Sequence, residues 1–94
     1  MKKTEIAAMQ HYVNTVHQDY TRAKIALTEA MIKGDHRAEE LYRDEARTTW
    51  NIRYGALMAL RAAGQDWELD DLSRELEREL DEVDERFKTF LGIK

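Results

Sequence analysis

Histidine and carboxylate side chains are the residues that could perform acid–base or metal chemistry, and in this sequence they are scattered. The three histidines, His11, His17 and His36, form no i,i+4 pair and no HExxH motif. Glu40 and Asp44 lie one helical turn apart, but no Glu-x-x-His partner follows them. This pattern is typical of surface charge and gives no support to a metal site.

The sequence also gives little indication of a catalytic nucleophile or of a phosphate-binding loop. Ser73 is the only serine and has no histidine near it in sequence, and the chain contains no cysteine and no glycine-rich phosphate loop. We therefore expect a protein that is not an enzyme and that has no metal, cofactor or small-molecule substrate.

A stripe of arginine and aromatic residues is the strongest candidate for a binding surface. On a helix, steps of three and four residues place one set on a single side: Arg43, Arg47, Trp50, Tyr54, Met58 and Arg61. These residue types are enriched where proteins bury partners, and arginine beside aromatics also suits stacking on single-stranded bases. The alternative is that Trp50 and Tyr54 pack beneath a neighbouring helix while the arginines lie along its rim. Both interpretations stay open.

Small residues recur beside this stripe at Gly55, Ala59 and Ala63. Glycine inside a helix costs about 1 kcal/mol relative to alanine, so some packing gain should offset it. A ridge of small residues allows another helix to approach closely. We expect that helix to be either the third helix of the same chain or a helix of a second copy.

The charge of the chain is unevenly distributed. The net charge is −4, but residues 66–88 contain eleven acids and four bases and so carry −7, leaving +3 for the remainder. This segment predicts an acidic face, which is either a recognition surface or a solvated side of a helix. The face consists of Asp70, Asp71, Glu77, Asp81, Asp84 and Glu85.

Glycine and aspartate mark the boundaries of the elements that must position these residues. Gly34 and Gly64 interrupt the apolar periodicity, and each is closely followed by an aspartate, Asp35 and Asp66. Glycine closes a helix in the left-handed conformation, and aspartate caps the next helix. With no proline in the chain, these signals predict three helices, at about 4–33, 35–63 and 66–91.

The apolar pattern differs among the three segments. The first keeps a heptad, the third advances with an eleven-residue period, and the middle one carries a wide apolar belt. We predict an all-α, up-down-up antiparallel three-helix bundle, with the middle helix contacting both others. Helices of this length make a rod with a small interior, which favours dimerisation into a larger bundle.

Length and composition limit the class of protein. At 94 residues with 43% hydrophobic content, residues 1–94 are expected to form one domain. No run approaches the roughly 20 apolar residues of a membrane span, and the N-terminal MKKTEIAAMQHYV lacks a continuous apolar stretch. We expect a cytoplasmic protein.

These observations favour a non-enzymatic, regulatory protein–protein interaction protein that self-associates and acts by binding a partner's surface. Its size and composition would suit a bacterial or phage accessory or inhibitor protein. The alternative is a nucleic-acid-binding accessory protein that uses the arginine and aromatic stripe, which requires its basic residues to converge in space. The acidic net charge makes nucleic acid the less favoured partner.

Overall fold

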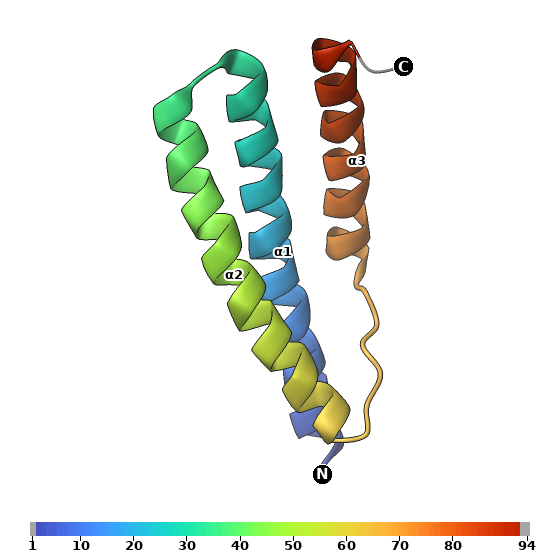
Figure 1. The fold of residues 1–94 in the computed structure, drawn as a ribbon. Coiled ribbons are helices and arrows are strands. Elements are labelled where there is room, and N and C mark those ends of the chain that lie inside the picture. The colour runs from blue at the N-terminus through green and yellow to red at the C-terminus, as the bar shows by residue number, and fades with distance from the viewer. Residues whose placement is uncertain (1, 93–94) are drawn as a thin grey trace.

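The computed structural model describes residues 2–92, which form three helices joined by a tight turn and a longer linker (Figure 1). α1 spans Lys3–Lys33, α2 spans His36–Ala62 and α3 spans Asp71–Leu91. α1 and α2 form an antiparallel hairpin, and α3 runs in the same direction as α1. The predicted all-α, up-down-up arrangement is confirmed, and the first two helices end within one residue of their predicted bounds.

The turn between α1 and α2 follows the predicted glycine–aspartate signal. Gly34 adopts a left-handed conformation with φ of 71°, and its N–H donates to the carbonyls of Ala30 and Met31. The Asp35 side chain then accepts a hydrogen bond of 3.1 Å from the Ala38 N–H at the start of α2. Both helix ends are therefore satisfied by local groups.

The start of the third helix was predicted wrongly. Gly64 does close α2, with φ of 74°, but residues 65–70 form a non-helical linker and α3 begins at Asp71. Asp70 is the N-cap, and its carboxylate accepts a hydrogen bond of 2.8 Å from the Ser73 N–H. The predicted cap, Asp66, instead lies in the linker, where its carbonyl accepts from the side chain of Gln10 on α1. Contacts with α1 thus hold the linker backbone away from a helical path.

The central helix of the bundle is α1, which corrects the expectation that the middle segment touches both others. α1 packs against α2 on one side and against α3 on the other, whereas α2 and α3 do not pack on each other (Figure 1). The wide apolar belt of α2 does not mark two contact faces, because part of it faces solvent: Leu41, Trp50 and Ile52 are all exposed. The second contact face of α1 is largely polar, so apolar periodicity does not reveal it.

Two small apolar clusters form the core. The first joins α1 to α2 through Val13, Leu57 and Leu60, with Trp67 of the linker packed against it. The second joins α1 to α3 and consists of Ile25, Leu76 and Val83, with Leu80 at its edge. The heptad of α1 is largely buried within the bundle, at Val13, Val16, Ala23, Leu27 and Ala30.

The described residues form a flattened rod of 50 × 24 × 17 Å. Their radius of gyration is 15.4 Å, whereas a compact domain of this length has about 12 Å. None of the three helices offers an apolar stretch long enough to cross a bilayer. The elongated shape leaves a large surface over a thin core, as expected for three slender helices.

Candidate functional site

Amide side chains of α1 hold the linker against the bundle. The Gln10 side chain donates to the Asp66 carbonyl and accepts from the Glu68 N–H at 3.2 Å, so that it pairs with the extended backbone on both sides. One turn later, the Asn14 side chain donates to the Glu68 carbonyl at 2.9 Å. These bonds fix the linker path that brings Trp67 and α3 into place.

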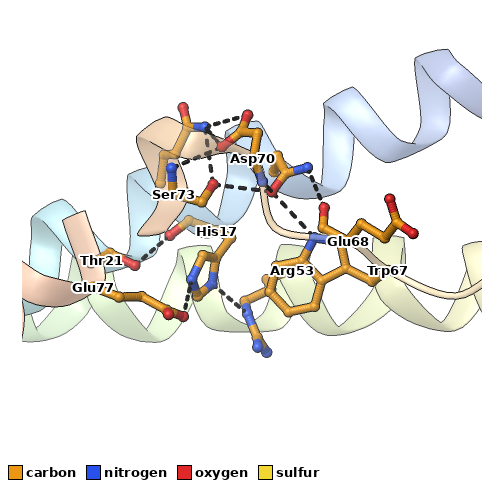
Figure 2. Close-up of polar contacts among 10 residues, drawn as sticks. His17, Thr21, Arg53, Trp67, Glu68, Asp70, Ser73 and Glu77 are labelled. Carbon is orange, nitrogen blue, oxygen red and sulfur yellow. Dashed lines mark hydrogen bonds and ion pairs between the residues drawn. The ribbon is translucent and has the colours of Figure 1, made fainter. Parts of the chain in front are cut away.

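Asn14 is the centre of this polar network, and its partners Trp67, Asp70 and Ser73 are labelled in Figure 2. Its side chain is buried, and its amide oxygen accepts three hydrogen bonds, from Trp67 Nε1 at 3.3 Å, from the Asp70 N–H at 3.2 Å and from the Ser73 hydroxyl at 3.0 Å. Gln18, a further turn along α1, donates to the Asp70 carboxylate at 3.1 Å and to the Ser73 hydroxyl at 3.1 Å. Hydrogen bonds to Ser73, and also to Gln18, lower the pKa of the Asp70 carboxyl. Because buried polar atoms are costly when unpaired, this network specifies where α3 begins.

His17 connects all three helices. Its Nδ1 accepts a hydrogen bond of 3.0 Å from Arg53 Nε on α2, and its Nε2 lies 2.9 Å from Glu77 Oε1 on α3 (Figure 2). The imidazole also meets the Trp67 ring edge-on, with centroids 4.9 Å apart. A single buried side chain thus bridges the two helices that do not pack on each other.

The Arg53 contact decides the state of this histidine. Arginine can only donate, so Nδ1 must carry a lone pair and Nε2 must carry the proton that it donates to Glu77. Burial lowers the pKa of His17, the hydrogen bond to Glu77 opposes that effect, and the charge of Arg53 lowers the pKa further. Both ring nitrogens are engaged, so this imidazole has no free lone pair to offer a substrate. Its arrangement supports a structural role.

Arg53 also fixes the position of Trp50. Its guanidinium lies 4.7 Å from the Trp50 ring centroid and 5.1 Å from that of Trp67. Trp50 also packs against Tyr20 of α1, with ring centroids 5.1 Å apart. Trp50 nevertheless stays 44% exposed. It is therefore an aromatic side chain that is held in one orientation but remains open to a partner.

Trp50 lies at the edge of a groove between α1 and α2, which we name the aromatic–cationic groove. It has a volume of about 320 Å³ and is lined by Tyr20, Lys24 and Leu27 of α1 and by Arg43, Ala46, Arg47 and Trp50 of α2. Arg43 pairs with Glu39 at 3.1 Å and Arg47 approaches Asp44 at 3.9 Å, both at the surface. Exposed pairs of this kind contribute little stability, so both arginines can exchange partners at low cost.

The predicted stripe divides between this groove and open surface. Arg43, Arg47 and Trp50 line the groove, whereas Tyr54 is 57% exposed, Arg61 is exposed and Met58 is half-buried outside it. The interpretation that Trp50 and Tyr54 lie beneath another helix is wrong within the described chain. The reason is that α3 packs on α1 and leaves this side of α2 uncovered.

The small-residue ridge faces away from α3. A methyl group added at Gly55 would meet nothing within 4 Å, so no helix of the same chain approaches there. Ala59 lines a second groove of about 310 Å³, which is almost wholly apolar and is completed by Ala8, Met9, Tyr12 and Ala56. Close packing by the third helix is therefore excluded, and packing by a second copy stays a prediction.

The predicted acidic face contains residues with different environments. Asp71, Asp81 and Glu85 are exposed, and Asp84 is half-buried. Glu77 is bonded to His17, and Asp70 is the helix cap held by Gln18, so Asp70 lies in the polar network and does not belong to an open surface. Asp81 and Asp84, farther along α3, have no ion-pair partner within the part of the chain that the structure describes.

Sequence reasoning missed the polar network and the residues of α1 that line the aromatic–cationic groove. Gln10, Asn14 and Gln18 recur every four residues on α1, beside the heptad, and this spacing is a detectable sign of a second contact face. The heptad of the first helix includes Tyr20 and predicts only that it packs in the bundle. No comparable pattern indicates the roles of Arg53 and Lys24, because their partners lie on other helices.

Within residues 2–92, no three histidine, aspartate or glutamate side chains gather as a metal site would require. Comparison of the chain with protein-family models, curated proteins and solved structures finds no match. Any proposal about function therefore rests on the geometry of the site.

Proposed function

We propose that this protein is a non-enzymatic, regulatory or accessory binding protein that acts by occupying a partner protein's surface through the aromatic–cationic groove. The observation that carries this proposal is the half-exposed Trp50, oriented by Tyr20 and Arg53 at the edge of a groove with three cationic side chains. Tryptophan, tyrosine and arginine dominate binding energy at protein interfaces. An anchor that is already ordered loses little entropy on binding.

The lining of the groove indicates the chemistry of its partner. Lys24, Arg43 and Arg47 line the groove together with the buried apolar side chains of Leu27 and Ala46, and no carboxylate lines the groove itself. A protein segment that presents carboxylates around an apolar or aromatic side chain would complement both features. An acidic protein surface is therefore the proposed ligand.

Single-stranded nucleic acid is the second candidate, because Lys24, Arg43 and Arg47 converge beside two aromatic rings. Against it stands the acidic composition of α3. Other basic residues, among them Arg22 and Arg37, lie outside the groove. Three cations give only a small counterion-release contribution to affinity at physiological salt.

The test combines capture of binding partners with two variants of the groove. We expect Trp50→Ala and Arg47→Glu each to weaken capture of a specific protein from host lysate by tenfold or more, since hot-spot residues contribute about 2 kcal/mol or more. Phe90→Ala is the matched control, because Phe90 is an aromatic residue of α3 that is 57% exposed and lines neither groove. Circular dichroism checks that each variant stays helical.

Equal capture by Trp50→Ala, Arg47→Glu and the control would refute the proposed function. Fluorescence polarisation with labelled single strands at low and high salt distinguishes the second candidate. Salt-sensitive nucleic-acid binding that Arg47→Glu abolishes would replace a protein partner with a nucleic acid.

A further inference from the structure

The side of α1 that lies open between α2 and α3 is bordered by two walls of opposite charge, one on each of these two helices. Its floor is the α1 stripe of His17, Tyr20 and Lys24, which are spaced by three and four residues and so share one side of the helix. The α2 wall presents Arg43 and Arg47, which line the groove beside Tyr20 and Lys24.

The α3 wall is acidic. Glu77 is directed to the floor by its hydrogen bond to His17, and Asp81 and Asp84 follow it by four and seven residues, on the same side of α3. Lys88 continues this stripe but is paired with Glu85 at 3.2 Å. The carboxylates of Asp81 and Asp84 have no ion-pair partner among the described residues.

The opposite charges lie at the same height along the rod. The groove places Arg43 and Arg47 beside Lys24 and Leu27 of α1. On the other side of α1, Ile25 packs with Leu76 and Val83, and Val83 lies between Asp81 and Asp84 in the chain. Both charged sets therefore lie level with residues 24–27 of α1, on either side of it.

We propose that the groove is occupied by the acidic wall of a second copy, in a two-fold dimer whose axis runs parallel to α1. This inference rests on the proposed function and names its partner. A rotation by 180° about such an axis leaves each residue at the same level along the rod and exchanges the α2 side with the α3 side. As a result, α2 of one copy faces α3 of the other. Arg43 and Arg47 then face Asp81 and Asp84 of the second copy, and symmetry produces the contact twice.

Charge disfavours the alternative two-fold arrangement of the same faces. An axis perpendicular to the helices at the level of residues 24–27 would place α2 on α2 and α3 on α3, so that arginines face arginines and aspartates face aspartates. Like charges in contact are strongly unfavourable at an interface. The parallel axis also brings the half-exposed Trp50 against the second copy, and it covers both walls of a rod whose core is thin.

Charge reversal tests the dimer directly, with mass measured by light scattering after size exclusion. We expect wild type to be a dimer that weakens at high salt. The pairs Arg43→Glu with Arg47→Glu, and Asp81→Lys with Asp84→Lys, should each raise the dimer dissociation constant by at least tenfold. An equimolar mixture of the two variants should regain a dimer, because each supplies the charge that the other lacks.

Matched controls reverse the same number of charges elsewhere. Arg22→Glu with Arg37→Glu changes two arginines outside the groove, and Glu75→Lys with Glu82→Lys changes two acids turned by 100° or more from Asp81 on α3. Both control pairs should stay dimeric. Circular dichroism establishes that every variant is folded before its mass is compared.

Three outcomes would overturn the inference: a wild-type monomer up to submillimolar concentration, a dimer that survives both reversals, or reversed variants that do not associate when mixed. Loss of the dimer on Ala59→Arg alone would assign the contact to the apolar groove on the other side and would also reject it. The proposed function fails separately, when Trp50→Ala and Arg47→Glu leave partner capture unchanged. A monomer that still captures an acidic protein through Trp50 would keep the function and reject the dimer.

Discussion

α1 has two interfaces built from different interactions. Against α2 its core is apolar, with Leu60 and Val13 almost fully buried. Against the linker and α3 it is polar over half its length, with Asn14 and Gln18 buried and hydrogen-bonded, and apolar only around Ile25. Apolar burial supplies most folding free energy without direction, whereas hydrogen bonds contribute less but fix register. We infer that the first interface stabilises the bundle and the second determines where α3 lies.

The largest expected effect is in the apolar interface. Leu60 is fully buried in the cluster with Val13 and Leu57. Leu60→Ala should lower the free energy of unfolding by about 3 kcal/mol, because it removes apolar contact and leaves a cavity. Urea denaturation followed by circular dichroism measures this.

Leu72→Ala on α3 is the control for that change, because Leu72 is 44% exposed. It should cost less than about 0.5 kcal/mol. Similar losses for the two leucines would mean that the α1–α2 interface is not the main source of stability.

An intermediate and local effect is expected from Asn14→Leu. The substitution keeps the side chain's size but removes the acceptor of Trp67, Asp70 and Ser73, at a cost of about 2 kcal/mol. Hydrogen exchange should rise in residues 65–70 and at the start of α3 while the α1–α2 hairpin stays protected.

Asn51→Leu on the exposed side of α2 serves as the control for the polar network. It should leave exchange in the linker unchanged. Uniform loss of protection in Asn14→Leu, across α1 and α2 as well, would contradict the division of roles between the two interfaces.

The smallest expected effect is a pH dependence from His17. Because burial lowers its pKa in the folded protein, the unfolded chain binds the proton more readily. The contribution of His17 to the free energy of unfolding is therefore complete above about pH 6.5. It is lost as the pH falls from there toward the lowered pKa of the folded state, by at most about 1.4 kcal/mol per pH unit. Arg53, Glu77 and Asp70 are the charged groups around this imidazole.

Thermal melting between pH 7.5 and 5 measures this dependence, and the pH range is chosen around the ordinary histidine pKa of about 6.5. Wild type should lose stability over this range, and His17→Gln should lose distinctly less. His36→Gln, whose side chain is 91% exposed, should follow wild type. A His17→Gln profile that matches wild type would show that this histidine does not link stability to protonation.

The sequence alone predicts the local features of this fold. The glycine–aspartate signal at Gly34 and Asp35 and the heptad of α1 identify two helices and their ends, because capping and helical periodicity depend on residues only a few positions apart. The stripe containing Arg43, Arg47 and Trp50 is also visible in sequence, since its members lie on one helix.

The tertiary structure alone decides which helix is central, where α3 begins and whether Trp50 is covered. Each depends on side-chain contacts between distant positions, such as Asn14 with Asp70 or His17 with Arg53 and Glu77. The four-residue spacing of Gln10, Asn14 and Gln18 marks a polar side of α1, but the partners of these residues follow no period along the chain. Which segment covers that polar side is therefore decided only when the linker and α3 fold against it.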